Sequence, residues 1–118
     1  MTESTCGFER KIYEILGFLG VPIRMLGHRY MEDALQIMLE DEEAPYAITK
    51  LVYFPVARKH GTSSKQVESA IRTAVRAAWY NGNCERHERI LGYSRNTGTK
   101  PCNSEFLLRV LAYLRFTP

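Results

Sequence analysis

Apolar residues recur along most of this chain at intervals of three and four positions, which is the spacing of an amphipathic helix. The first run consists of Phe8, Ile12, Ile15, Leu16 and Leu19. Gly20 and Pro22 follow it as stop signals, so we predict a first helix over about residues 8–19. A second run extends from Tyr30 to Leu39. It ends in the acidic stretch 40–43, which we expect to form a solvated loop because acidic side chains disfavour a helix C-terminus.

Two prolines punctuate the middle of the chain. Pro45 predicts the start of a third helix and Pro55 the start of a fourth, because proline fits the first turn of a helix. Since only a few residues separate the two, we expect the third helix to run into the fourth with a break near Phe54.

The C-terminal third contains two helical runs separated by a loop. Cys84 to Leu91 predicts a short helix bounded by Gly92, and residues 93–102 are rich in turn-forming residues. Asn103 is placed to cap a last helix. The inward positions of that helix are Phe106, Leu107, Val110, Leu111 and Leu114. No strand pattern occurs, so we predict an all-α, compact single domain of six or seven helices over residues 1–118.

The stretch 55–80 predicts a helix-turn-helix. Its second helix, about 64–80, carries apolar residues on one face, at positions 67, 70, 71, 74, 75 and 78. Its joint suits two helices that cross closely: Ala57 is small, Gly61 can adopt a positive φ and Val67 fills the angle between them. The alternative is an ordinary αα-hairpin whose outer face is merely solvated.

The outward face of the second helix is cationic. It carries Lys65, Ser69, Arg72 and Arg76, and Ser63 or Ser64 precedes it as a candidate N-cap. The overall net charge of +3 divides into −5 for residues 1–43 and +8 for residues 44–118. We therefore expect the C-terminal two-thirds to face a polyanion and the acidic N-terminal part to face away.

The three cysteines do not predict a disulfide or metal framework. Cys6, Cys84 and Cys102 form no C-x-x-C pair, and one loose Cys84-x-x-His87 spacing is a weak zinc signal. We expect reduced thiols, no metal and no cofactor. No run is long and apolar enough for a membrane span and no signal peptide is recognisable, so we expect a cytoplasmic protein.

Several blocks of the sequence resemble one family, the DNA-binding effector domain of the sporulation initiation response regulator, stage 0 sporulation protein A. The most specific blocks are Val67-Glu68-x-Ala70-Ile71-Arg72 and Lys100-Pro101-x-Asn103-Ser104-Glu105-Phe106. Others that match in order are Gly20-Val21-Pro22, Gly27-His28-Arg29-Tyr30, Ile48-Thr49-Lys50, Ala57-Arg58-Lys59, Ala78-Trp79 and Leu91-Gly92-Tyr93. The resemblance extends from about Ile12 to Leu114.

This resemblance implies a six-helix fold whose helix-turn-helix binds promoter DNA, in tandem or paired copies, and regulates early sporulation genes. It implies double-stranded DNA as the partner, with a homodimer on DNA and RNA polymerase subunits as further expected partners. Tyr113, Phe116 and the last helix are candidates for pairing. In the family a receiver domain controls the effector domain. We expect no receiver within these 118 residues, because a receiver would itself take about a domain's length.

The chain departs from the family on the reading helix. Gln66 and Ser69 stand where the resemblance leads one to expect arginines, and Thr73 stands in place of histidine. Glu68 and Arg72 are retained, so part of the base reading is expected to survive while the operator changes. The proline before the first motif helix, Pro55, is also one residue later than in the family.

We predict two sets of DNA contacts, with the helix at about 64–80 in the major groove. The base-contacting residues are Gln66, Glu68, Ser69, Arg72 and Thr73. The phosphate-contacting residues are Arg58, Lys59, Lys65, Arg76, Arg95 and Lys100. Arg72 suits guanine O6 and N7, and Glu68 could accept from cytosine N4 or hold Arg72 in position.

The competing interpretations concern function and individual side chains. A helical protein-interaction module without sequence-specific DNA binding would also explain the helices. An enzyme is disfavoured because no phosphate loop, H-E-x-x-H motif or nucleophile and base pair occurs. Trp79 is expected to anchor the core. The histidines are expected at the surface or in capping positions; they are His28, His60 and His87.

Overall fold

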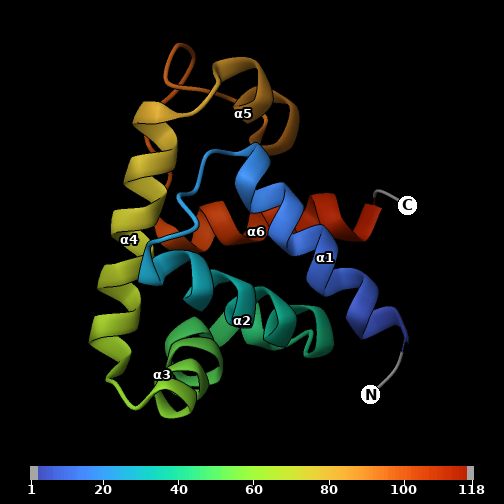
Figure 1. Cartoon of the computed structure of the whole chain (residues 1–118), viewed down its shortest axis with the longest axis vertical. Helices are drawn as coiled ribbons and strands as arrows, with labels where there is room; N and C mark the ends of the chain where they lie inside the picture. Colours follow the sequence, from blue (N-terminus) through green and yellow to red (C-terminus); the bar gives the residue numbers. More distant parts are fainter. Residues whose placement is uncertain (1–2, 117–118) are drawn as a thin grey trace.

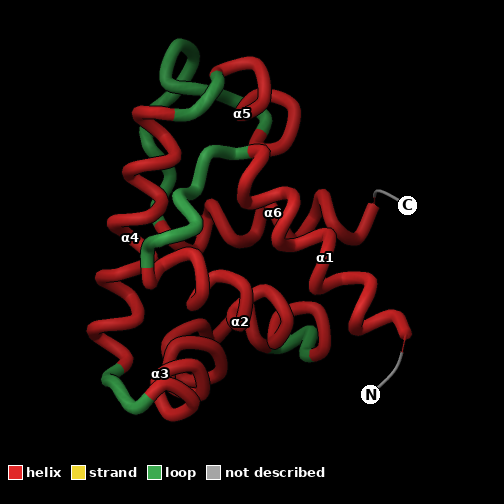
Figure 2. The backbone as a smooth tube through the Cα atoms, viewed as in Figure 1, coloured by secondary structure: helices red, strands yellow, loops and turns green. Residues whose placement is uncertain are grey.

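The computed structural model describes residues 3–116, with side chains from residue 7 onward, and this part of the chain is all-helical. Six α-helices occur, at α1 (Glu3–Phe18), α2 (Leu26–Glu40), α3 (Phe54–His60), α4 (Ser64–Asn81), α5 (Cys84–Leu91) and α6 (Asn103–Phe116). A 3₁₀ turn η1 (Ala44–Ala47) and a π-helical turn η2 (Thr49–Tyr53) link α2 to α3. Within residues 3–116 no strand occurs (Figure 2), so the predicted fold class is confirmed.

Helix α4 forms one edge of the molecule, and two other helices begin against it. The starts of α2 and α6 both meet α4, whereas α1 and the two chain ends lie on the opposite side (Figure 1). The molecule measures 36 × 32 × 27 Å along its principal axes. This arrangement leaves the long side of α4 that faces away from α2 and α6 open to solvent.

The core draws on all six helices. Fully buried side chains include Leu16 of α1, Met31 and Leu35 of α2, Ile71 of α4 and Leu107 of α6. Burying one such aliphatic side chain stabilises the fold by about 1.5–3 kcal/mol. Trp79 is also buried at the end of α4, as predicted, where its ring stacks on that of His87.

The middle of the chain differs from the predicted pair of helices. Pro45 lies in the first turn of η1, and what was expected as a third helix is a 3₁₀ turn followed by a π turn. No backbone break occurs at Phe54: Tyr53 and Phe54 both have right-handed helical φ and ψ. Pro55 explains the change, because it lacks the N–H that would continue the hydrogen-bond ladder, so the π turn gives way to α3 there.

The first two helices begin earlier than predicted, and the predicted acidic loop forms over residues 41–43, while Glu40 is still helical. α1 begins at Glu3 and α2 at Leu26, whereas the apolar runs alone indicated about 8 and 30. α2 ends at Glu40, and the acidic residues 41–43 are non-helical. Asp41 accepts a hydrogen bond from the backbone N–H of Glu43 at 2.9 Å, which orders this loop locally.

Two expectations about polar side chains are wrong. Asn103 does not cap α6: it is the first helical residue, and its Nδ2 donates to the carbonyl of Glu68 at 2.9 Å. His28 and His87 are buried instead of exposed. The Nε2–H of His87 donates to the Leu19 carbonyl at 2.9 Å, so this ring joins the end of α1 to α5.

Candidate nucleic-acid interface

A tight turn sets the angle between α3 and α4. α3 ends at His60, and the next residue, Gly61, has a φ of 66°, in the left-handed region that glycine adopts without strain. The Thr62 N–H bonds back to the Ala57 carbonyl at 2.9 Å, which closes the end of the helix. Ala57 and Val67 are both buried. The positive φ of Gly61 and the burial of Ala57 and Val67 agree with what the sequence predicted.

The start of α4 is capped by Ser63. Its Oγ accepts a hydrogen bond from the backbone N–H of Gln66 at 3.1 Å. The hydroxyl of Thr62 in addition donates to the side-chain carbonyl of Gln66. The first turn of α4 is thus fixed by contacts within the turn itself, and the side chain of Gln66 is held beside the N-terminus.

The two faces of α4 differ sharply in exposure. Buried on the inner face are Val67, Ile71, Ala74, Val75 and Ala78. Exposed on the outer face are Lys65, Gln66, Glu68, Ser69, Arg72, Thr73 and Arg76. All five residues predicted to contact bases are therefore accessible from one side of a single helix.

An ion pair and a backbone contact restrain two of these side chains. Arg72 Nη2 lies 3.6 Å from Glu68 Oε2, and 56% of the Arg72 side chain remains exposed. A pair of this kind, one helical turn apart, is weak in water, so it orients Arg72 without holding it. The hydroxyl of Thr73 donates to the Ser69 carbonyl at 3.1 Å.

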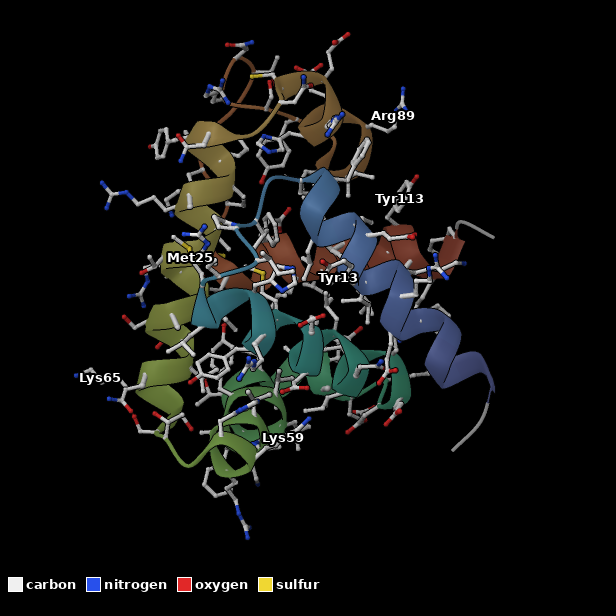
Figure 3. All side chains as sticks on the ribbon, in the orientation of Figure 1. Tyr13, Met25, Lys59, Lys65, Arg89 and Tyr113 are labelled. Atoms are coloured by element: carbon white, nitrogen blue, oxygen red, sulfur yellow. The ribbon has the colours of Figure 1, made fainter. Side chains whose placement is uncertain are left out.

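The cations predicted to contact phosphate have different partners. Arg58 lies over the Phe54 ring at 5.9 Å, and Lys59 pairs with Asp33 of α2 at 2.9 Å. In the described part of the chain neither Lys65 nor Arg76 has an ion-pair partner, and Lys65 extends away from the body of the molecule (Figure 3).

Arg95 and Lys100 lie in the loop between α5 and α6. Arg95 Nη1 donates to the carbonyls of Trp79 and Gly82, both at 3.0 Å, so this side chain caps the C-terminus of α4. Lys100 borders a hollow of about 220 Å³ between α4, η2 and the start of α6. The hollow is lined by Ile48, Thr49, Tyr53, Glu68, Arg72, Lys100, Cys102, Asn103 and Ser104. The loop thereby brings one further cation beside Arg72.

Two titratable groups at this hollow have shifted pKa values. The hydrogen bond to the Ser104 hydroxyl, followed by one to the Glu105 backbone, lowers the pKa of the exposed Cys102 thiol. Burial raises the pKa of the Tyr53 hydroxyl, against the opposing hydrogen bond of Asn103. Sequence reasoning missed this cluster because it brings together residues from three separate segments; the only available signal was the family block at 100–106.

No metal centre is formed in the described part of the chain, where no group of three or more His, Cys, Asp or Glu side chains is placed to hold an ion. In the weak Cys84-x-x-His87 signal, His87 is buried and its Nε2 is bonded to the Leu19 carbonyl. Among residues 3–116, no helix combines the length and apolar character needed to cross a bilayer.

Together these features define an all-α domain with the element order helix, turn, helix and an accessible, polar outer face on the second helix. Comparison with known protein families matches residues 12–114 to the family described as Sporulation initiation factor Spo0A C terminal. The chain therefore belongs to this family of DNA-binding effector domains of sporulation response regulators. The match covers α2 to α5 entirely, the part of α1 from Ile12 onward and all but the last two residues of α6.

Proposed function

We propose that this chain is a sequence-specific transcription regulator that inserts α4 into the DNA major groove. The observation that carries this proposal is the outer face of α4, where the polar residues of the reading positions are exposed together. An α-helix of about 10–12 Å diameter fits a major groove about 12 Å wide. The fixed turn at Gly61 supports the proposal further, because it sets the direction of α4 relative to α3.

Each reading residue has a base partner that suits its chemistry. The guanidinium of Arg72 fits guanine O6 and N7, and Glu68 both orients Arg72 and can accept from cytosine N4. The methyl group of Thr73 fits a thymine methyl, since its hydroxyl is bonded within the helix. Gln66 offers its amide NH₂ group and Ser69 its hydroxyl. Only one arginine occupies this set, so we expect fewer guanine contacts than the family pattern gives.

The residues predicted to contact phosphate differ in whether they already have a partner within the molecule. Lys65 and Arg76 flank the reading residues along α4 and are free to bind phosphate directly. Arg58 and Lys59 lie on the last turn of α3, and Lys59 must leave Asp33 before it can bind. We also assign Arg95 and Lys100 here; Arg95 acts from the C-terminal end of α4 while it caps that helix.

Pairing of two chains on DNA is part of the proposal. Phe116 is 85% exposed at the end of α6, and Tyr113 lies one turn before it. A single small domain covers limited DNA surface, and a second copy doubles the contacts. RNA polymerase subunits are the further partners that a transcription regulator of this kind would meet.

A protein-interaction module without DNA binding is the alternative function. It is favoured by a groove of about 270 Å³ between α1, α5 and α6, remote from the outer face of α4. The groove is lined by Lys11, Glu14, Ile15, Phe18, Arg89, Ile90, Tyr113 and Leu114. Absence of any mobility shift with duplex DNA at low salt would favour this alternative.

The test begins with selection of bound duplexes from a random pool, followed by affinity measurements with Arg72→Ala. We expect the substitution to cost about 1–3 kcal/mol on the selected duplex and much less on a scrambled one. Arg109→Ala is a matched control, because Arg109 pairs with Glu105 one turn earlier, as Arg72 pairs with Glu68, and is similarly exposed. Equal losses on both duplexes with Arg72→Ala would contradict the base-reading role.

A further inference from the structure

We infer that the start of α2 forms a second DNA contact, which binds the phosphates of one strand beside the groove that α4 occupies. The inference rests on the proposed function and extends it to residues outside the helix-turn-helix. We refer to this surface as the α2-start patch. It consists of Ile23, Arg24, Leu26 and Arg29.

Close packing fixes the α2-start patch against the middle of α4. A Cβ atom added to Gly27 would lie 2.3 Å from the Ala70 carbonyl oxygen and 2.6 Å from the Ala74 Cβ. The backbone of the first turn of α2 therefore touches α4 directly. Met25 lies at this junction, where the chain reaches α4 before α2 begins (Figure 3).

The α2-start patch lies on one particular flank of α4. At about 100° per residue, Ala70 projects from the same side as Gln66 and Thr73. Glu68 projects from the other side, where its carbonyl is bound by Asn103 of α6. The starts of α2 and α6 thus lie along opposite flanks of the reading face.

The two arginines of the α2-start patch are exposed and have no ion-pair partner among the described residues. Asp33 stands one helical turn after Arg29, where it could pair with it, but its carboxylate is bound by Lys59 and His60 instead. A phosphate group would therefore meet Arg24 and Arg29 without displacing an internal acid.

Two apolar side chains complete the surface. Ile23 and Leu26 are 59% and 60% exposed, although both are large and hydrophobic. Exposed apolar residues that cluster among cations are typical of an interaction surface. The DNA backbone matches this mixture, since its charged phosphates alternate with sugars that present carbon atoms.

The geometry of the groove points to the same occupant. A helix that fills the major groove has the phosphates of both strands along its flanks. On the α6 flank, Lys100 borders the hollow beside Arg72. On the α2 flank, Arg24 and Arg29 are the exposed cations at the start of the helix, and we assign them the corresponding role. Each flank of α4 thereby serves one strand.

The first experiment compares two double variants on the selected duplex. Each phosphate contact contributes about 0.9 to the slope of log affinity against log salt concentration. We expect Arg24→Ala with Arg29→Ala to lower the slope by about 1.8, which equals an about twelvefold smaller loss of affinity between 50 and 200 mM salt. Arg10→Ala with Arg89→Ala removes the same charge elsewhere on the surface and should barely change the slope. Equal changes in the two variants would overturn the inference.

Ethylation interference then identifies the strand. With the parent chain, ethylated phosphates on both strands should weaken binding; with the Arg24→Ala and Arg29→Ala variant, the interference should disappear on one strand only. Loss on both strands, or on neither, would overturn the inference. Substitution of both arginines by lysine preserves charge and should preserve the slope. If the parent chain shows no sequence preference at all, the proposed function fails instead, so the two failures are distinguishable.

Discussion

The cations on the outer face of α4 and those on α1 and α6 differ in whether an acidic side chain of the same molecule pairs with them. Lys65 and Arg76 on the outer face of α4 have no internal acid as a partner in the described structure. On α1 and α6, by contrast, Arg10 pairs with Glu14 at 3.4 Å and Arg109 pairs with Glu105 at 2.7 Å. The first group can bind phosphate at no cost in broken contacts, whereas the second is neutralised within its own helix. The difference teaches that the distribution of acids, as much as that of bases, marks the face for a polyanion.

Two cations near α4 depart from this comparison: Arg72 pairs with Glu68 within α4, and Lys59 pairs with a different helix. Lys59 lies on α3 beside α4, yet Asp33 of α2 holds it at 2.9 Å, and His60 shares the same carboxylate. The pair joins α2 to the turn that positions α4. We interpret Lys59 as a residue that first orients the helix pair and contacts phosphate only when the Asp33 pair opens.

The largest expected effect comes from a substitution that disrupts the packing of α2 against α4. Gly27→Ala would place a methyl group against the backbone of α4, where the Ala70 carbonyl cannot move aside easily. We expect the free energy of unfolding to fall by about 3 kcal/mol, measured by chemical denaturation. DNA affinity should fall as well, because α2 can no longer sit on α4.

Gly17→Ala is the control for this substitution. Gly17 also lies within a helix, but a Cβ there would meet nothing within 4 Å. Alanine is the better helix former, so we expect this variant to gain about 0.5–1 kcal/mol of stability. A similar loss in both variants would show that the contact between α2 and α4 is not what makes Gly27 necessary.

Local signals made α4 predictable. Gly61, Ser63 and the apolar spacing from Val67 onward lie within a few residues of the structure that they determine, so α4 was placed to within one residue at each end. The same is true of α5, whose limits are an Asn83 cap and a Gly92 stop. The exposure of the outer face of α4 followed directly from the periodicity.

Long-range contacts could not be predicted from local pattern. His87 is buried, and its Nε2–H donates a hydrogen bond to the Leu19 carbonyl, 68 positions earlier. Asn103 resembles a helix cap in sequence, yet it binds Glu68, 35 positions away. The sequence did not predict the π turn at η2 either. Over only five residues, the apolar spacings of an α-helix and a π-helix are too similar to tell apart. These features depend on which distant segments of the chain contact each other, and local patterns in a single sequence do not predict those contacts.

The next prediction sharpens the contrast between free and paired cations. Arg76→Ala should lower the salt slope of DNA binding by about 0.9, the value for one full phosphate contact. Lys59→Ala should lower it by less, because Asp33 competes with phosphate for the same ammonium group. Fluorescence anisotropy across a salt series gives both slopes. Asp33→Asn provides the check: it should raise affinity and enlarge the effect of Lys59→Ala, and an unchanged Lys59 effect would contradict the competition.

The smallest expected effect concerns the two cysteines whose side chains are described, Cys84 on α5 and Cys102 beside Arg72. Because hydrogen bonds from Ser104 and the Glu105 backbone lower the pKa of Cys102 in the folded chain, its thiolate should form at lower pH than in denatured protein. Its contribution to stability is therefore present above the unfolded-state pKa and is lost as the pH falls through the folded-state value. Iodoacetamide labelling followed by mass spectrometry over a pH series measures the pKa of Cys102, and Ser104→Ala should move the midpoint of the labelling curve to higher pH.

Bound duplex should slow labelling of Cys102 several-fold and leave labelling of Cys84 unchanged, because only Cys102 borders the hollow beside Arg72 on α4. Equal protection of both thiols would mean that DNA does not approach along α4.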